Sequence, residues 1–245
     1  MLQLLLLAVV GLWAGAQNAL AGGGSFLTYP VLLFAGLDPR AANITSTVAL
    51  FPSQIAIAWS GWRSAEGVGR LSVKALAAIS LAGGVVGALL LLATPISFFA
   101  RLLPWLMLFA TVVFAFGQKI RQHLSAGQHL PPAALGAIQA GIAAYGGYFG
   151  AGIGFLMVAA LSLAGQGVRV AATTKNILAA VMNAAAVIVF AFSGQARWSF
   201  ALALAVGSVA GGLLGGWLLL RIPERLLRLG IIGLGSALTV WLFLR

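Results

Sequence analysis

Cysteine is absent from this chain of 245 residues, and only three side chains are acidic: Asp38, Glu66 and Glu224. The absence of cysteine excludes disulfides, thiol nucleophiles and cysteine-ligated metals. The two histidines, His123 and His129, lie in one polar loop and are too few for a metal site. Intramembrane proteases need paired aspartates, a serine–histidine pair or a zinc motif. The sequence therefore predicts neither an enzyme nor a bound metal or other cofactor.

Charge is scarce as well, at 7% of the residues, while hydrophobic residues make up 62%. The apolar runs between the charges are long enough for helices of about 20 residues, the length that a bilayer requires. No polar stretch is long enough for a soluble domain. The sequence therefore predicts an all-α, multi-pass integral protein of the inner (plasma) membrane. The clearest runs are Leu71–Ala93, Leu102–Gly117, Ile177–Phe192, Phe200–Leu220 and Leu226–Leu244.

The net charge of +11 does not indicate a nucleic-acid partner. Lysine and arginine occur singly or in small groups near the ends of the apolar runs, as is typical of membrane proteins. The lipid bilayer is therefore the expected partner of this basic chain. The first apolar run has no basic residue before it, so we expect it to be a membrane helix and not a cleaved signal peptide.

Two stretches recur at half the length of the chain. The stretch LLFAGLDPRAANITST, Leu32–Thr47, aligns without gaps on LSLAGQGVRVAATTKN, Leu161–Asn176. Further along, Ser80–Pro95 aligns on Ser208–Pro223 at nearly the same offset. These ordered matches predict two membrane repeats, residues 1–117 and 133–245, joined by a connecting loop over residues 118–132.

Each predicted repeat contains a glycine-broken apolar segment, a short apolar segment and three spanning helices. The short segments, Phe26–Phe34 and Phe155–Leu163, are too short to cross a membrane at 1.5 Å per residue. They are therefore predicted to be half-helices that end inside the membrane. The spanning helices are predicted at Ile44–Trp59, Leu71–Ala93 and Leu102–Gly117 in the first repeat, and at Thr174–Phe192, Phe200–Leu220 and Leu226–Leu244 in the second. The second repeat opens with a helix over Ala133–Phe149.

The distribution of basic residues favours repeats of opposite orientation. If each short segment returns the chain to the side on which its half began, four basic residues lie on one side and ten on the other. Four full crossings per half would split them seven and seven. A bias toward the cytoplasm is expected of a membrane protein. We therefore expect inverted repeats, the arrangement of many secondary transporters.

The glycine breaks occur at corresponding places, at GGGS in the first half and YGGYFGAGIGFL in the second. A helix that begins inside the membrane exposes unpaired N–H groups and a partial positive charge. Glycine lets a ligand approach those groups, so the paired breaks predict an anion site between the repeats. The glycine pairs Gly83–Gly84 and Gly211–Gly212 lie within long apolar runs, where close helix packing explains them.

Polar residues beside the breaks complete the predicted site. Asparagine, serine and threonine donate hydrogen bonds without adding negative charge. Lys175 would neutralise the ligand, or would reach toward the lipid headgroups instead. Gln54 and Asn183 are weaker candidates, since either could bond between helices. The predicted substrate-binding residues are Asn18, Gly22, Gly23, Gly24, Ser25, Asn43, Thr45, Ser46, Tyr145, Gly150, Gly152, Gly154, Thr173, Thr174, Lys175 and Asn176.

The first-half motif AGGGSFLTYPVLLFAGLDPRAANITST, together with its partial copy at half-length, resembles the sulfite exporter TauE/SafE family of membrane permeases. The resemblance covers nearly the whole chain. The second half departs from the motif, with Ala159 where Pro30 would align and with spaced glycines. The resemblance implies export of a small anionic substrate such as sulfite, thiosulfate or an organosulfonate.

The shortage of carboxylates also bears on how transport is driven. Ionisable residues inside a membrane usually mark proton relays, and no carboxylate falls within a predicted span. We therefore expect facilitated export, or a substrate that carries its own proton. An anion channel and a non-transporting membrane subunit stay open as alternatives, and so does a homo-oligomer. A subunit without transport activity does not account for the two matched helix breaks.

Overall fold

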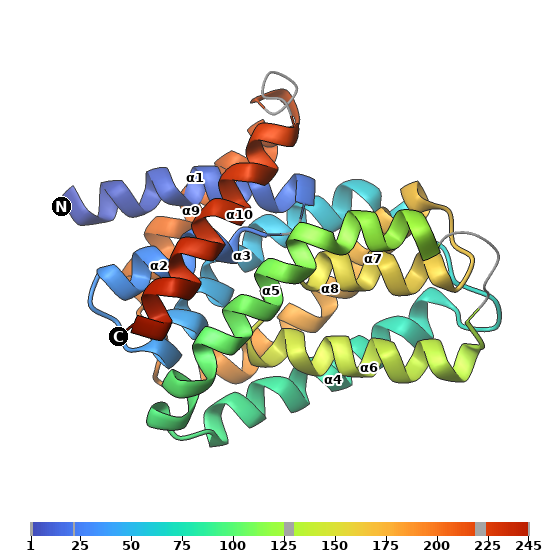
Figure 1. Ribbon diagram of the computed structural model, residues 1–245, viewed down its shortest axis with the longest axis horizontal. Helices are drawn as coiled ribbons and strands as arrows, with labels where there is room; N and C mark the ends of the chain where they lie inside the picture. The colour runs from blue at the N-terminus through green and yellow to red at the C-terminus, as the bar shows by residue number, and fades with distance from the viewer. Residues whose placement is uncertain (1, 22, 125–129, 219–223, 245) are drawn as a thin grey trace.

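The computed structural model describes residues 2–21, 23–124, 130–218 and 224–244, and helices account for most of this part of the chain (Figure 1). A single turn of 3-10 helix, Trp62–Ser64, follows the third helix. The α-helices confirm the all-α prediction. They are α1 (Leu2–Ala21), α2 (Ser25–Phe34), α3 (Pro39–Gly61), α4 (Val73–Ala93), α5 (Ile96–Leu124), α6 (Pro132–Tyr148), α7 (Ile153–Leu163), α8 (Val168–Ala191), α9 (Trp198–Leu218) and α10 (Glu224–Leu244).

Several of these helices are long and apolar enough to cross a membrane. In the part of the chain that the structure describes, four stretches qualify: Pro39–Ser64, Val73–Ala93, Ile96–Gly117 and Val168–Ala191. The helices α9 and α10 are 21 residues long, although their described apolar stretches are shorter. The short helices predicted from the sequence are present as α2, with 10 residues, and α7, with 11.

The third helix of each half begins earlier than the sequence predicted. Helix α3 begins at Pro39, five residues before the predicted start at Ile44, because Asp38 caps it. The Asp38 carboxylate accepts hydrogen bonds from the backbone N–H groups of Arg40 and Ala41, at 3.0 and 3.1 Å. Proline in the first turn favours this start. Helix α8 likewise begins at Val168, before its predicted start at Thr174. The candidate site residues that follow these starts are therefore helical.

The boundary between the predicted repeats also differs in detail. Helix α5 continues to Leu124, well into the stretch predicted as the connecting loop. Glutamine, lysine and arginine favour helix nearly as well as leucine does, so polarity alone does not end a helix. Helix α6 begins at Pro132, the last residue of the predicted loop.

The two halves pack against each other through reciprocal helix pairs. Helix α1 lies along α9, and its counterpart α6 lies along α4. Helix α3 packs on α9 in the same way that its counterpart α8 packs on α4. Glycines bring these pairs together: a side chain at Gly87 would meet the Ala144 carbonyl of α6, and one at Gly211 would meet the Leu12 carbonyl of α1. The predicted packing role of the Gly83–Gly84 and Gly211–Gly212 pairs agrees with these contacts.

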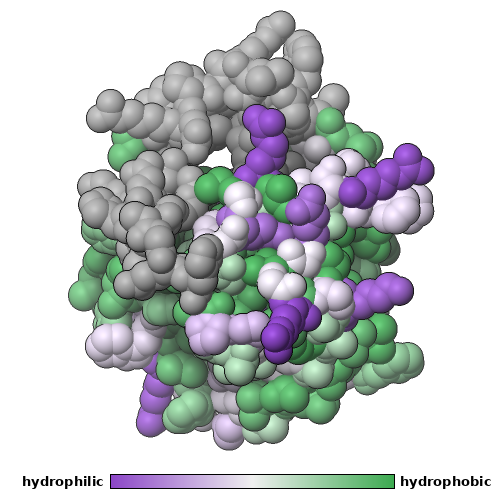
Figure 2. Space-filling view, turned by 90° about the vertical axis from the view of Figure 1, so that its right-hand side faces the viewer, coloured by the Kyte–Doolittle hydropathy of each residue, from purple (hydrophilic) through white to green (hydrophobic). Residues whose placement is uncertain are grey.

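Several helices, among them α1, α4 and α6, lie roughly along the long axis of the molecule, whereas α10 crosses it steeply (Figure 1). Helix α1 begins at the left-hand end of Figure 1, whereas α6 begins at the right-hand end. Helices α4 and α6 run in the same direction, since Gly83 lies against Ala140 and Gly87 against Ala144. Figure 2 looks onto the right-hand end and shows hydrophilic side chains gathered there. This end carries the α3–α4 connection, with the exposed side chains of Arg63 and Arg70.

The two short helices meet on α5. Phe26 of α2 and Phe155 of α7 are equivalent residues of the two halves, and both rings pack edge-on against Phe114. The ring centroids lie 5.6 and 4.8 Å from that of Phe114. Phe26 and Phe114 are each 1% exposed, so this contact lies within the core. It brings the beginnings of α2 and α7 near one another, in the interior of the protein.

Candidate anion-binding site

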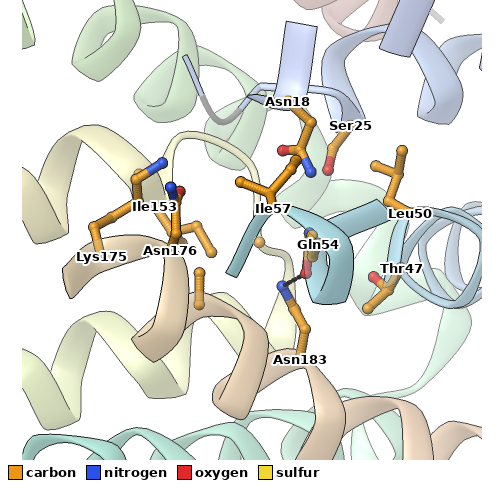
Figure 3. A pocket seen from close by; sticks show the side chains of 13 residues that line it. Asn18, Ser25, Thr47, Leu50, Gln54, Ile57, Ile153, Lys175, Asn176 and Asn183 are labelled. Carbon is orange, nitrogen blue, oxygen red and sulfur yellow. Dashed lines mark hydrogen bonds between the residues drawn. The ribbon is translucent and has the colours of Figure 1, made fainter. Parts of the chain in front are cut away.

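A small cavity lies between the two halves, with walls from α1, α2, α3, α7 and α8 (Figure 3). Its volume is about 40 Å³. A single water needs roughly 10–15 Å³, so the cavity suits a small ion with some water. The lining residues are Asn18, Ser25, Thr47, Leu50, Gln54, Ile57, Gly150, Ile153, Gly154, Lys175, Asn176, Ala179 and Asn183.

The walls of this cavity are built from equivalent positions of the two halves. The alignment of Leu32–Thr47 on Leu161–Asn176, carried along the chain without a gap, pairs eight of the lining residues with one another. Both members of each pair line the cavity. The pairs are Ser25 with Gly154, Thr47 with Asn176, Leu50 with Ala179, and Gln54 with Asn183. Both halves therefore present the same helix faces to a shared space.

The first residues of both short helices lie on the cavity wall. Ser25 is the first residue of α2, and Ile153 and Gly154 are the first two of α7. The first N–H groups of a helix have no carbonyl partner within it, and they carry part of a positive charge. Gly150 also lines the cavity. Its backbone φ is +81°, a conformation that residues other than glycine rarely adopt. The second glycine break thus shapes the wall directly.

Lys175 provides the cationic group of the cavity. It lies on α8, is only 7% exposed and lines the cavity. Among the carboxylates whose side chains the structure describes, Asp38 and Glu66, neither forms an ion pair with Lys175. Burying a charge without a partner is costly. A bound anion would supply the partner that the described part of the protein does not.

Two amides form the opposite part of the lining. The Asn183 Nδ2 donates a hydrogen bond to the Gln54 Oε1 at 2.7 Å, which links α8 to α3. Asn183 is 4% exposed. The prediction that these residues bond between helices is therefore confirmed, and the same residues also line the cavity. Figure 3 shows this bond, with the side chains of Lys175 and Asn176 to its left.

The structure brings part of the predicted site together and places the rest elsewhere. The predicted residues on the cavity wall are Asn18, Ser25, Gly150, Gly154, Lys175 and Asn176. Gly22 lies outside the described residues. Gly23 and Gly24 are buried at the first break and do not line the cavity. Their carbonyls accept hydrogen bonds from the side chains of Gln17 and Thr28, at 2.6 and 3.3 Å.

Three predicted residues of α3 are engaged in contacts within the protein. The Asn43 Nδ2 donates to the Tyr148 carbonyl at 2.9 Å. The Thr45 hydroxyl accepts from the Arg197 N–H at 3.0 Å, and the Ser46 hydroxyl pairs with that of Thr28 at 2.6 Å. None of the three lines the cavity. Their polarity serves to join helices, which the sequence did not distinguish from ligand binding.

The remaining predicted residues of the second half also lie off the cavity wall. The Tyr145 hydroxyl donates to the Ala151 carbonyl at 2.9 Å, which fixes the second break. Thr173 donates to the Val170 carbonyl at 2.8 Å, and Thr174 accepts from the Glu66 N–H at 3.2 Å. Gly152 caps α7 with φ at +79°.

The sequence analysis left several lining residues out of its predicted site. Thr47 is part of the repeated motif and aligns with Asn176, so the repeat itself carried the signal. Gln54 and Asn183 lie beyond the quoted motifs, and extending the same alignment pairs them. Leu50, Ile57, Ile153 and Ala179 are apolar, and composition gives no reason to select them.

Comparison with known proteins gives a consistent result. Residues 7–242 of the chain match the protein family described as "Sulfite exporter TauE/SafE". It is similar to "Probable membrane transporter protein" of Haemophilus influenzae, with 26% identity over 92% of this chain and 88% of that protein. "Probable membrane transporter protein ORF9" of Sinorhizobium sp is 31% identical over 85% of this chain and 80% of its own length. "Probable membrane transporter protein YfcA" of Escherichia coli K12 is 29% identical over 89% and 81%.

The family match spans nearly the whole chain and both glycine breaks, and it agrees with the helical architecture. The protein is thus a multi-pass membrane protein of a transporter family. It belongs to the sulfite exporter TauE/SafE family.

Proposed function

We propose that this protein is a carrier in the inner membrane that exports small sulfur-containing anions such as sulfite, thiosulfate or organosulfonates. The substrate binds in the cavity between the two halves. The observation that carries the proposal is the buried side chain of Lys175 on the same cavity wall as the first residues of α2 and α7. A cation and two helix N-termini all attract an anion.

The small volume and the composition of the lining support this substrate class. The described lining contains no carboxylate that would repel an anion. Serine, threonine, asparagine and glutamine side chains provide neutral hydrogen-bond donors around the cation. The space suits an anion of a few heavy atoms.

The orientation of the halves supports a carrier with inverted repeats. Helix α1 and its counterpart α6 begin at opposite ends of the molecule (Figure 1). Carriers of this kind bind substrate at the interface of the repeats and expose the site by moving one unit against the other. A cavity lined by equivalent positions of both halves fits this mode of action.

Transport by the purified protein in liposomes tests the proposal. Uptake of sulfite and of thiosulfate is measured in wild type and in Lys175→Gln, with counterflow of labelled thiosulfate against unlabelled substrate. We expect saturable counterflow in wild type and a loss of apparent affinity of about tenfold to one-hundredfold in the variant, because a hydrogen bond to a charged group is removed.

Lys74→Gln is the matched control, since Lys74 is an exposed lysine in the first turn of α4 and should be dispensable. Equal transport by wild type and Lys175→Gln would rule out this site. Flux without counterflow would indicate a channel, and the absence of any flux or binding of sulfur anions would show that the substrate class is wrong.

A further inference from the structure

The amide pair formed by Gln54 and Asn183 occupies a special position in the cavity. The two residues are equivalent in the two halves, and one hydrogen bond of 2.7 Å joins them. Residues at equivalent positions of the two halves can contact each other only at the boundary between the halves. The pair therefore lies on the boundary between the halves, in the wall of the cavity (Figure 3).

The amide pair has unused hydrogen-bonding capacity that faces the cavity. Two amides joined by one hydrogen bond retain one carbonyl oxygen and three N–H bonds, whichever of them donates. Among the described buried side-chain atoms that lack a partner, none belongs to Gln54 or Asn183. The two amide atoms outside that bond, the Gln54 Nε2 and the Asn183 Oδ1, are therefore not sealed within the protein, and both residues line the cavity.

The amide pair and the lysine contribute different interactions. Lys175 lies eight residues before Asn183 on α8, a separation of about 12 Å along the helix axis at 1.5 Å per residue. The charge of Lys175 and the helix N-termini attract any anion, whatever its shape. Amide N–H groups are directional donors, and they favour a ligand that has oxygens at matching angles. A site built to make such bonds rejects a ligand that cannot make them.

We propose that the Gln54–Asn183 amide pair is the selectivity element of this site, and that it favours small oxyanions over halides. The inference rests on the proposed function and deepens it, since it assigns discrimination between anions to two neutral side chains. Lys175 and the helix ends set the overall attraction, and the amide pair determines which anion is retained.

Calorimetric titration of the full chain in detergent with thiosulfate and with bromide tests the inference. We expect wild type to prefer thiosulfate. Asn183→Leu, which keeps the size of the side chain, is expected to weaken thiosulfate binding about tenfold to one-hundredfold and to leave bromide binding unchanged. The exchanged variant Gln54→Asn/Asn183→Gln keeps both amides and is expected to keep the preference.

Gln54→Leu provides a second test if Asn183→Leu does not fold. Equal weakening of both anions by the leucine variants, or weakening of neither, would overturn the inference. A wild-type protein that binds both anions equally would overturn it too, while leaving an anion site in place. A wild-type protein that binds neither anion would contradict the proposed function itself and the inference with it.

Discussion

Single glycines determine how closely the helices of the two halves approach. Gly87 of α4 faces the backbone of α6, where an added methyl group would meet the Ala144 carbonyl and lie 2.7 Å from the Tyr148 nitrogen. Gly141 of α6 has nothing within 4 Å of the same position. The two glycines are both helical, and they differ in whether another helix passes over them. Comparing the same substitution at the two positions therefore separates the effect of helix packing from that of helix propensity.

We predict that Gly87→Ala lowers the free energy of unfolding by about 1–3 kcal/mol, because the added methyl group forces α4 and α6 apart. Gly141→Ala is the control and should be neutral or stabilising by up to about 1 kcal/mol, since alanine favours helix over glycine. Thermal unfolding of both variants in the same detergent measures the difference. Equal melting temperatures would show that α4 and α6 do not pack as closely as described.

Single residues also show what the sequence can and cannot reveal about the site. Lys175 and Asn176 were predicted from their polarity beside a repeated motif, and they line the cavity. Thr45 and Ser46 were chosen for the same reason, yet they point elsewhere. The difference is helical phase: the α3 residues on the cavity wall are Thr47, Leu50, Gln54 and Ile57, spaced by three or four. Polarity without that phase does not separate ligand contacts from contacts between helices.

At the scale of elements, α5 supports both short helices through one ring. Phe114 is 1% exposed and contacts Phe26 of α2 and Phe155 of α7. Short helices of 10 and 11 residues gain little stability of their own, so tertiary packing must hold them. Phe116, two residues further along α5, is 51% exposed and faces outward.

We predict that Phe114→Ala destabilises the protein by about 3–5 kcal/mol, as large-to-small changes in a core do. It should also weaken anion binding, because the first residues of α2 and α7 line the cavity. Phe116→Ala removes the same ring from an exposed position and should change neither property strongly. Thermal unfolding and thiosulfate titration of both variants provide the test. A Phe114→Ala protein with wild-type anion affinity would show that α5 does not position the short helices.

The existence of these elements was easier to predict than their ends. The short helices followed from two apolar runs beside glycine breaks, and both are present. The start of α3 was predicted too late, because its first turn is polar and depends on a cap by Asp38. The end of α5 was predicted too early, because polar residues continue the helix to Leu124. Hydrophobic runs therefore mark the portion of a helix that lipid or core requires, and not its full length.

At the scale of the whole molecule, equivalent threonines tie the halves together at opposite ends. Thr45 of the first half accepts from the Arg197 N–H of the second, at 3.0 Å. Thr174 of the second half accepts from the Glu66 N–H of the first, at 3.2 Å. Each bond joins a third helix to the connection before the fourth helix of the other half. The cavity lies between the two halves that these bonds join.

The predicted inversion of the repeats can be tested directly, because the chain contains no cysteine and a single introduced thiol is the only one. Arg70 lies in the α3–α4 connection and Gln195 in the corresponding α8–α9 connection. Inverted repeats place these corresponding connections on opposite sides of the membrane, whereas parallel repeats place them on the same side.

We therefore predict that an impermeant maleimide added outside intact cells labels only one of Arg70→Cys and Gln195→Cys. Since basic residues favour the cytoplasm, the unlabelled variant should be Arg70→Cys, and it should react after the cells are permeabilised. Labelling of both variants from the outside, or of neither, would exclude inversion.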